Sequence, residues 1–150
     1  MNPDFDDFLR ALTDAGARFL VTGAHALALH GVPRATGDLD IWIDASIENA
    51  DRVWKALAEF GAPMESLGIT RHDLTKPDMV VQVGLPPRRI DLLTGLSGLT
   101  FEDAWNDRVH YDTGSIQIPF IGRATLVVNK RETGRLKDRA DLEALGEESP

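Results

Sequence analysis

The amino-acid sequence predicts a single α+β domain in which a mixed β-sheet is flanked by helices and a helical pair closes the chain. Three observations predict this class. Two short apolar strands, at 18–22 and 36–44, are separated by a short helix, and a strand hairpin follows at 78–94. Residues at about 122–147 show the apolar spacing of helices. A chain of 150 residues is the size of one domain with a real core.

Clear sequence signals mark where helices and strands begin and end in the N-terminal half. Apolar residues recur at helical spacing over 4–15, and Gly16 ends that helix. The strand at 18–22 is followed at once by Gly23 and Ala24 and then by a helix over 25–30. Ser46 is placed as the N-cap of a helix that runs to Phe60.

The C-terminal half alternates hairpins with helices. We expect a short helix within 64–77, a hairpin of strands 78–85 and 88–94, and a helix over 100–107 capped by Thr100. Strands at 108–111 and 115–120 follow, and helices at 123–132 and 135–145 are divided at Gly134. In the last helix Leu136, Ala140 and Ala144 form an apolar stripe, with charged residues around the rest.

Composition excludes several classes of protein. The chain has no cysteine, which rules out disulfides and thiolate metal sites, and we expect a cytoplasmic protein without a membrane segment. Its net charge of −8 argues against a broad nucleic-acid-binding surface, although a local basic site lies near the C-terminus.

The stretch around Asp38 and Asp40 carries the strongest chemical signal. Strand side chains alternate between faces, so the two carboxylates are expected on one face, about 7 Å apart. Carboxylates held together are commonly neutralised by a hard cation such as Mg²⁺ or Mn²⁺. The alternative is that both are solvated residues on the polar face of a half-buried strand.

Asp91 is the third acidic candidate. It lies in the apolar run Ile90 to Leu93, where a charge is costly to bury unless it is paired or binds a metal. An edge or surface position is the alternative, and Arg88 or Arg89 could also pair with it.

The Gly23-Ala24 turn between strand and helix is a weaker signal. A turn of small residues lets the backbone approach a phosphate, and the N-terminus of the following helix would face it with free N–H groups. Most such turns have no ligand.

Taken in order, these parts resemble the nucleotidyltransferase fold of the polymerase-β superfamily. The matching residues are Thr22-Gly23-Ala24, then Asp38-Leu39-Asp40-Ile41, then Asp91. The run from Gly23 to Asp40 is similar to the small bacterial branch, which includes minimal nucleotidyltransferases and abortive-infection (AbiEii-type) toxin enzymes. The ending from Lys130 to Leu142 is similar to that branch's Lys…Gly-Arg-x-Lys-Asp-x-x-Asp-Leu pattern. Ala24 departs from the family, which has Gly or Ser there, so a hydroxyl that could bind phosphate is absent.

The resemblance implies a metal-dependent transfer of NMP from an NTP to a hydroxyl. Asp38, Asp40 and Asp91 would hold two Mg²⁺ or Mn²⁺ ions and act in catalysis. Nucleotide contacts would come from Gly23, Ala24, Arg34, Thr36, Lys130, Arg135 and Lys137, with Asp138 as a positioning residue. For the last helix the alternative is a solvated face, with ion pairs between Lys137 and Asp141 and between Arg135 and Asp138.

Three functions follow, in decreasing order of support. The first is a nucleotidyltransferase, in a toxin–antitoxin or phage-defence setting, whose acceptor is a tRNA, a protein or a small molecule. The second is a catalytically weak or inactive relative that acts as a binding or regulatory partner, which Ala24 favours. A metal-dependent nuclease ranks last, because no strand after the first Asp carries the acid-x-Lys that the common version needs. Since the chain is short, we expect a protein partner or a homodimer to complete the acceptor site.

Overall fold

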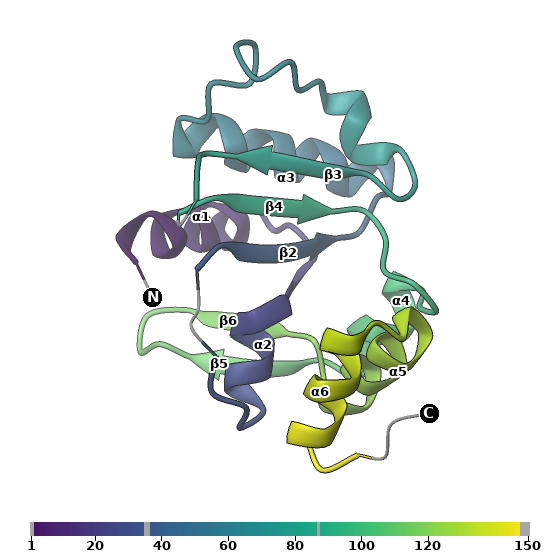
Figure 1. Cartoon of the computed structure of the whole chain (residues 1–150). Helices are drawn as coiled ribbons and strands as arrows, with labels where there is room; N and C mark the ends of the chain where they lie inside the picture. Colours follow the sequence, from purple (N-terminus) through teal and green to yellow (C-terminus); the bar gives the residue numbers. More distant parts are fainter. Residues whose placement is uncertain (1, 35–36, 87, 148–150) are drawn as a thin grey trace.

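A computed structural model describes residues 2–34, 37–86 and 88–147, which form one mixed sheet with helices around it (Figure 1). The order of the six described strands is β3-β4-β2-β1-β6-β5. β2 and β4 are parallel, as are β1 and β6, and the other neighbouring pairs are antiparallel. This architecture confirms the predicted α+β class.

The bounds of the elements follow the predicted order closely. The strands are β1 (Phe19–Thr22), β2 (Leu39–Ile43), β3 (Val80–Val83), β4 (Ile90–Leu93), β5 (Val109–Asp112) and β6 (Gln117–Phe120). The helices are α1 (Pro3–Asp14), α2 (Gly23–Leu29), α3 (Ile47–Phe60), α4 (Phe101–Asn106), α5 (Arg123–Thr133) and α6 (Leu136–Ala144), with a 3-10 helix, η1, at Arg71–Thr75.

Local signals in the sequence set several of these boundaries. The side chain of Ser46 accepts a hydrogen bond from Asn49 N at the start of α3, and Thr100 accepts one from Asp103 N at the start of α4. Gly134 ends α5 in the left-handed region, at φ 58°. The caps at Ser46 and Thr100 and the division at Gly134 are therefore confirmed.

The two faces of the sheet differ in character. In Figure 1, α1 and α3 lie behind β3, β4 and β2, while α2 and the α5–α6 pair lie at the lower end. Leu39, Ile41 and Leu92 are fully buried and alternate along the strands with Asp40 and Asp91. Because side chains alternate between faces, the two carboxylates lie on the face opposite those apolar residues.

The structure adds detail to two of the predicted helices, α2 and α6. α2 starts at Gly23 rather than at about His25, because Gly23 adopts a left-handed backbone (φ 65°) that takes the chain straight from strand to helix. The predicted stripe of Leu136, Ala140 and Ala144 lies on the exposed side of α6, where Leu136 is 82% exposed. In the described part of the chain, no helix combines the length and apolar character needed to cross a bilayer.

Candidate active site

Four polar side chains stand in a row across the sheet. Pairing of the strands places Gln82 beside Asp91, Asp91 beside Asp40, and Asp40 beside Thr22. Neighbouring strands lie about 4.8 Å apart, so the two carboxylates on β2 and β4 are direct neighbours. Two residues that are 51 positions apart in sequence are thus joined by the parallel pairing of β2 with β4.

Gly23 fits closely against the Asp40 carboxylate. A Cβ added to Gly23 would overlap Asp40 Oδ2 and would also contact the Cγ and Cβ atoms of Asp40. The glycine is therefore needed both for its left-handed backbone and for the space beside Asp40. With only seven residues in α2, we assign Gly23 this packing role rather than a helix-dipole role.

Replacing Gly23 with Ala is expected to lower the free energy of unfolding by about 2–4 kcal/mol, since backbone strain and overlap with Asp40 act together. Urea denaturation measures the loss. Gly31→Ala is the matched control, because Gly31 also has a positive φ (94°) but an added Cβ would meet no atom within 4 Å. Equal losses in the two variants would show that the contact with Asp40 contributes nothing.

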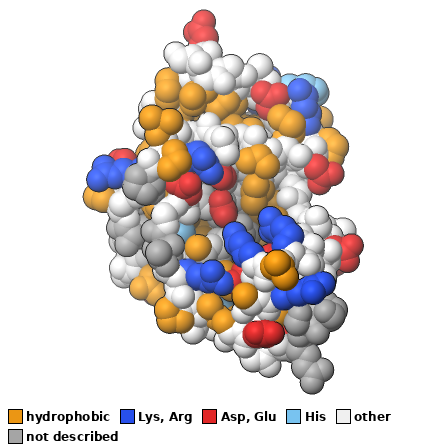
Figure 2. Space-filling view, viewed as in Figure 1, with side chains coloured by type: hydrophobic (Ala, Val, Ile, Leu, Met, Phe, Trp, Pro, Cys, Tyr) orange, Lys and Arg blue, Asp and Glu red, His pale blue; other side chains and the backbone are white. Residues whose placement is uncertain are grey.

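A cavity of about 170 Å³ opens beside Asp40. It is lined by Thr22, Gly23, Asp40, Leu93, Leu96, Leu126, Asn129, Lys130, Arg135 and Lys137. Figure 2 shows acidic side chains at the centre of this face with Lys and Arg side chains around them. An acidic group and three cations on the wall of one cavity suit a ligand that carries phosphates together with a cation.

The environment of Asp40 disfavours its charged form. Burial, together with the negative charges of Asp91 and Asp38, raises the pKa of Asp40 to about 6, although Lys137 and Arg89 oppose the rise. No hydrogen bond or ion pair ends on this carboxylate among the described residues. Asp40 is thus a crowded carboxylate whose charge a bound cation would stabilise.

The other two acids are held by Arg89. Its Nε lies 2.8 Å from Asp91 Oδ1 and its Nη2 lies 3.3 Å from Asp38 Oδ2. Within residues 2–34, 37–86 and 88–147, no three acidic or imidazole side chains lie together as a ready-made metal site. The donor set still suits Mg²⁺ or Mn²⁺ for two reasons. Asp38, Asp40 and Asp91 offer only carboxylate oxygens, and the negative charges around Asp40 outweigh the nearby positive ones.

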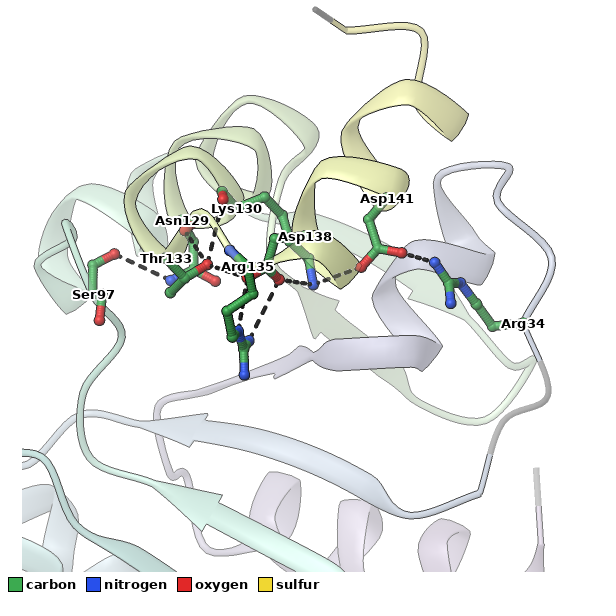
Figure 3. Close-up of polar contacts among 8 residues, drawn as sticks. All are labelled: Arg34, Ser97, Asn129, Lys130, Thr133, Arg135, Asp138 and Asp141. Atoms are coloured by element: carbon green, nitrogen blue, oxygen red, sulfur yellow. Dashed lines mark hydrogen bonds and ion pairs between the residues drawn. The ribbon is translucent and has the colours of Figure 1, made fainter. Parts of the chain in front are cut away.

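Behind the cavity wall lies a cluster of buried charges on α5 and α6 (Figure 3). Lys130 Nζ lies 2.9 Å from Asp141 Oδ2 and 3.3 Å from Asp138 Oδ1, and both carboxylates are fully buried. Asp138 also accepts hydrogen bonds from Thr133 Oγ1 (2.7 Å) and Arg135 Nε (2.8 Å). The Lys130 ammonium is therefore fixed in the wall by two carboxylates.

The pKa values of this cluster reflect burial and pairing in opposition. Burial would raise the pKa of Asp138, but hydrogen bonds from Arg135, Thr133 and Lys130 hold it well below its usual range. Burial lowers the pKa of Lys130, and the hydrogen bond to Asp138 offsets part of that lowering.

The solvated-face alternative for the last helix is wrong in its main point. The Arg135–Asp138 pair forms as that alternative expected, but Asp138 and Asp141 face inward. Asp141 pairs with Lys130 and with Arg34 rather than with Lys137. The physical reason is that Lys130 is buried under α6, and its charge attracts the two carboxylates to the inner face.

The structure brings some of the predicted site residues together and separates others. Gly23, Asp40, Lys130, Arg135 and Lys137 line the cavity, and Asp38 and Asp91 lie beside Asp40 with Arg89. Ala24 is absent from that lining, and Asp138 lies behind it with Lys130. Arg34 pairs with Asp141 at the far end of the charge cluster. Thr36 lies outside the described residues.

The polar residues of the site that were not among the predicted ones include Arg89, Asp141 and Asn129. Arg89 was considered only as a partner of Asp91, although its i,i+2 spacing on a strand places both side chains on one face. Asp141 was considered only in the solvated-face alternative, as a partner of Lys137. Asn129, whose amide donates to Ser97 O at 3.1 Å, had no sequence signal that set it apart.

Comparison with known proteins gives a fold-level likeness. No family model and no curated protein matches the chain. The structure does match that of a Thermotoga maritima protein described as a "putative nucleotidyltransferase", with a TM-score of 0.59 and 18% sequence identity over 95% of this chain and 92% of that chain. The chain therefore has a nucleotidyltransferase-like fold.

Proposed function

We propose that this chain is a metal-dependent nucleotidyltransferase that transfers NMP from an NTP to a hydroxyl group. The observation that carries the proposal is the cavity in which Asp40, beside Asp38 and Asp91, faces Lys130, Arg135 and Lys137. The nucleotidyltransferase-like fold supports it independently. The acceptor would be a tRNA, a protein or a small molecule, and a toxin–antitoxin or phage-defence setting remains part of the proposal.

The reaction assigns a task to each group. With the help of Asp91 the acceptor hydroxyl would give up its proton as its oxygen bonds to the α-phosphorus. The bond from the α-phosphorus to the oxygen that bridges it to the β-phosphate breaks, and pyrophosphate leaves. Lys130, Arg135 and Lys137 would bind the β- and γ-phosphates, and the absence of a side chain at Gly23 leaves space for the Asp40 carboxylate beside them. Asp38, Asp40 and Asp91 would hold Mg²⁺ or Mn²⁺, which when bound neutralises charge on the phosphates. A protein partner or a second copy of the chain would complete the acceptor site.

A second candidate is a catalytically weak or inactive relative that acts as a binding or regulatory partner. The specific observation in its favour is that Arg89 holds Asp38 and Asp91, so a fixed cation of the chain itself already balances two of the three acids. Ala24 in place of Gly or Ser points the same way.

Calorimetric titration with each of the four NTPs tests the proposal. Wild type is expected to bind one or more of them with Mg²⁺ present and to lose most binding in EDTA. Asp40→Asn should weaken binding at least a hundredfold, because it removes a charged ligand of the cation. Asp51→Asn, at an exposed position on α3, is the matched control and should bind like wild type. A well-folded wild type that binds no NTP would favour the second candidate.

A further inference from the structure

The guanidinium of Arg89 already neutralises two of the three candidate metal ligands, Asp38 and Asp91. Arg89 Nε and Nη2 contact the two oxygens of Asp91 at 2.8 and 3.2 Å, as a bidentate pair. Its Nη2 also lies 3.3 Å from Asp38 Oδ2, and its backbone N–H donates to Asp38 Oδ1 at 3.1 Å. A single residue therefore engages all four carboxylate oxygens of these two acids.

These contacts compete with a divalent cation for the same oxygens. Mg²⁺ binds carboxylate oxygens at about 2.1 Å and tolerates little distortion of its ligands. The guanidinium that holds Asp91 with two hydrogen bonds also contacts Asp38, so its positive charge would repel a second cation there. The guanidinium and a divalent cation therefore compete for these two acids.

Arg89 has a route by which it can leave. Its side chain is 27% exposed, whereas that of Asp91 is 12% exposed. Arg89 lies directly before β4, and its backbone carbonyl accepts a hydrogen bond from Leu39 N at 2.9 Å, so the backbone can stay in place while the side chain moves. Rotation about the side-chain bonds would carry the guanidinium to solvent without a change in the sheet.

We propose that Arg89 is a built-in counter-ion that stabilises Asp38 and Asp91 when no metal is bound and is displaced when a divalent cation binds. Metal loading is then an exchange of cations, and the apparent metal affinity is the intrinsic affinity multiplied by the fraction of molecules in which Arg89 has left the acids. This inference rests on the proposed function, because it takes the three acids as the metal ligands.

Titration with Mn²⁺ alone, without nucleotide, tests the exchange. Arg89→Gln is expected to bind Mn²⁺ about tenfold more tightly than wild type. This factor corresponds to a wild type in which Arg89 has left the acids in about one molecule in ten. Arg88→Gln is the matched control, because Arg88 is exposed and lines a hollow with Phe60 and Leu85 instead. Mn²⁺ should also raise the melting temperature of Arg89→Gln more than that of wild type.

A measurement on wild type covers the case in which Arg89→Gln does not fold. The Nε–Hε signal of Arg89 in NMR should move to the position of a solvated arginine as Mg²⁺ is added, while the amides of Asp38 and Asp91 shift in parallel. Three results would overturn the proposal: no tightening of Mn²⁺ binding in Arg89→Gln, an Arg89 signal that Mg²⁺ leaves unchanged, or no metal binding by either protein. Metal exchange without NTP binding would instead overturn the proposed function alone.

Discussion

Replacing Lys130 with Met is expected to lower the free energy of unfolding by about 3–5 kcal/mol, because it leaves two carboxylates buried without their shared counter-charge. Lys130 is 7% exposed, and Asp138 and Asp141 are fully buried. The long apolar side chain of Met retains most of the packing of the lysine stem, so the loss reports mainly on charge. Urea denaturation at pH 7 measures it.

The pH dependence of this loss separates charge from packing. The defect of Lys130→Met should shrink as the pH falls toward 4, because Asp138 and Asp141, which have lost the Lys130 ammonium, can then take up protons. Lys130→Met/Asp141→Asn should recover part of the stability at pH 7, since one buried charge is removed. Lys137→Met, on the exposed face of α6, is the control and should change stability by less than about 0.5 kcal/mol. A defect that stays constant with pH would assign the loss to packing.

Wild type is expected to lose about 2 kcal/mol of stability relative to Asp40→Asn as the pH rises from 4 to 7 in EDTA. The folded pKa of Asp40, about 6, lies above its ordinary value of 3.8. The stability linked to this group is therefore fully present below pH 3.8 and is lost as the pH rises through 6. The full shift would correspond to about 3 kcal/mol, and we reduce it because solvent reaches part of the group.

Chemical denaturation of both proteins at each pH measures the difference. Asp51→Asn should track wild type at every pH, because Asp51 is about half exposed. Adding Mn²⁺ should restore wild type but not Asp40→Asn at pH 7, since only the charged carboxylate can bind the ion. A difference that does not depend on pH would contradict the raised pKa of Asp40.

Much of the fold could be predicted because its signals are local. Ser46 and Thr100 satisfy backbone N–H groups a few residues away, and Gly134 ends its own helix. The hairpin of β3 and β4 follows from alternating apolar residues on either side of a short connection. The start of α2 could not be placed from the sequence, because Gly23 can enter either a turn or a helix with a positive φ.

The inner face of α6 shows where local reasoning fails. An apolar stripe normally marks the buried side of a helix, yet Leu136 is exposed and Asp138 is buried. Lys130 offsets part of the cost of burying these carboxylates, and Leu142 is buried with them on the inner face. Lys130 lies on another helix, and nothing in the pattern of α6 itself reports its position.

The sequence by itself determined the α+β class, the order of the strands and helices along the chain, and the acids Asp38, Asp40 and Asp91 as a candidate metal set. These depend on periodicity, caps and spacing, which act between residues close in the chain. Only the tertiary structure decided that β2 pairs with β4 in parallel, that Arg89 holds two of the acids, and that Lys130 turns Asp138 and Asp141 inward. Such contacts depend on the free energy of burying charges together, and that term exists only once distant segments have packed.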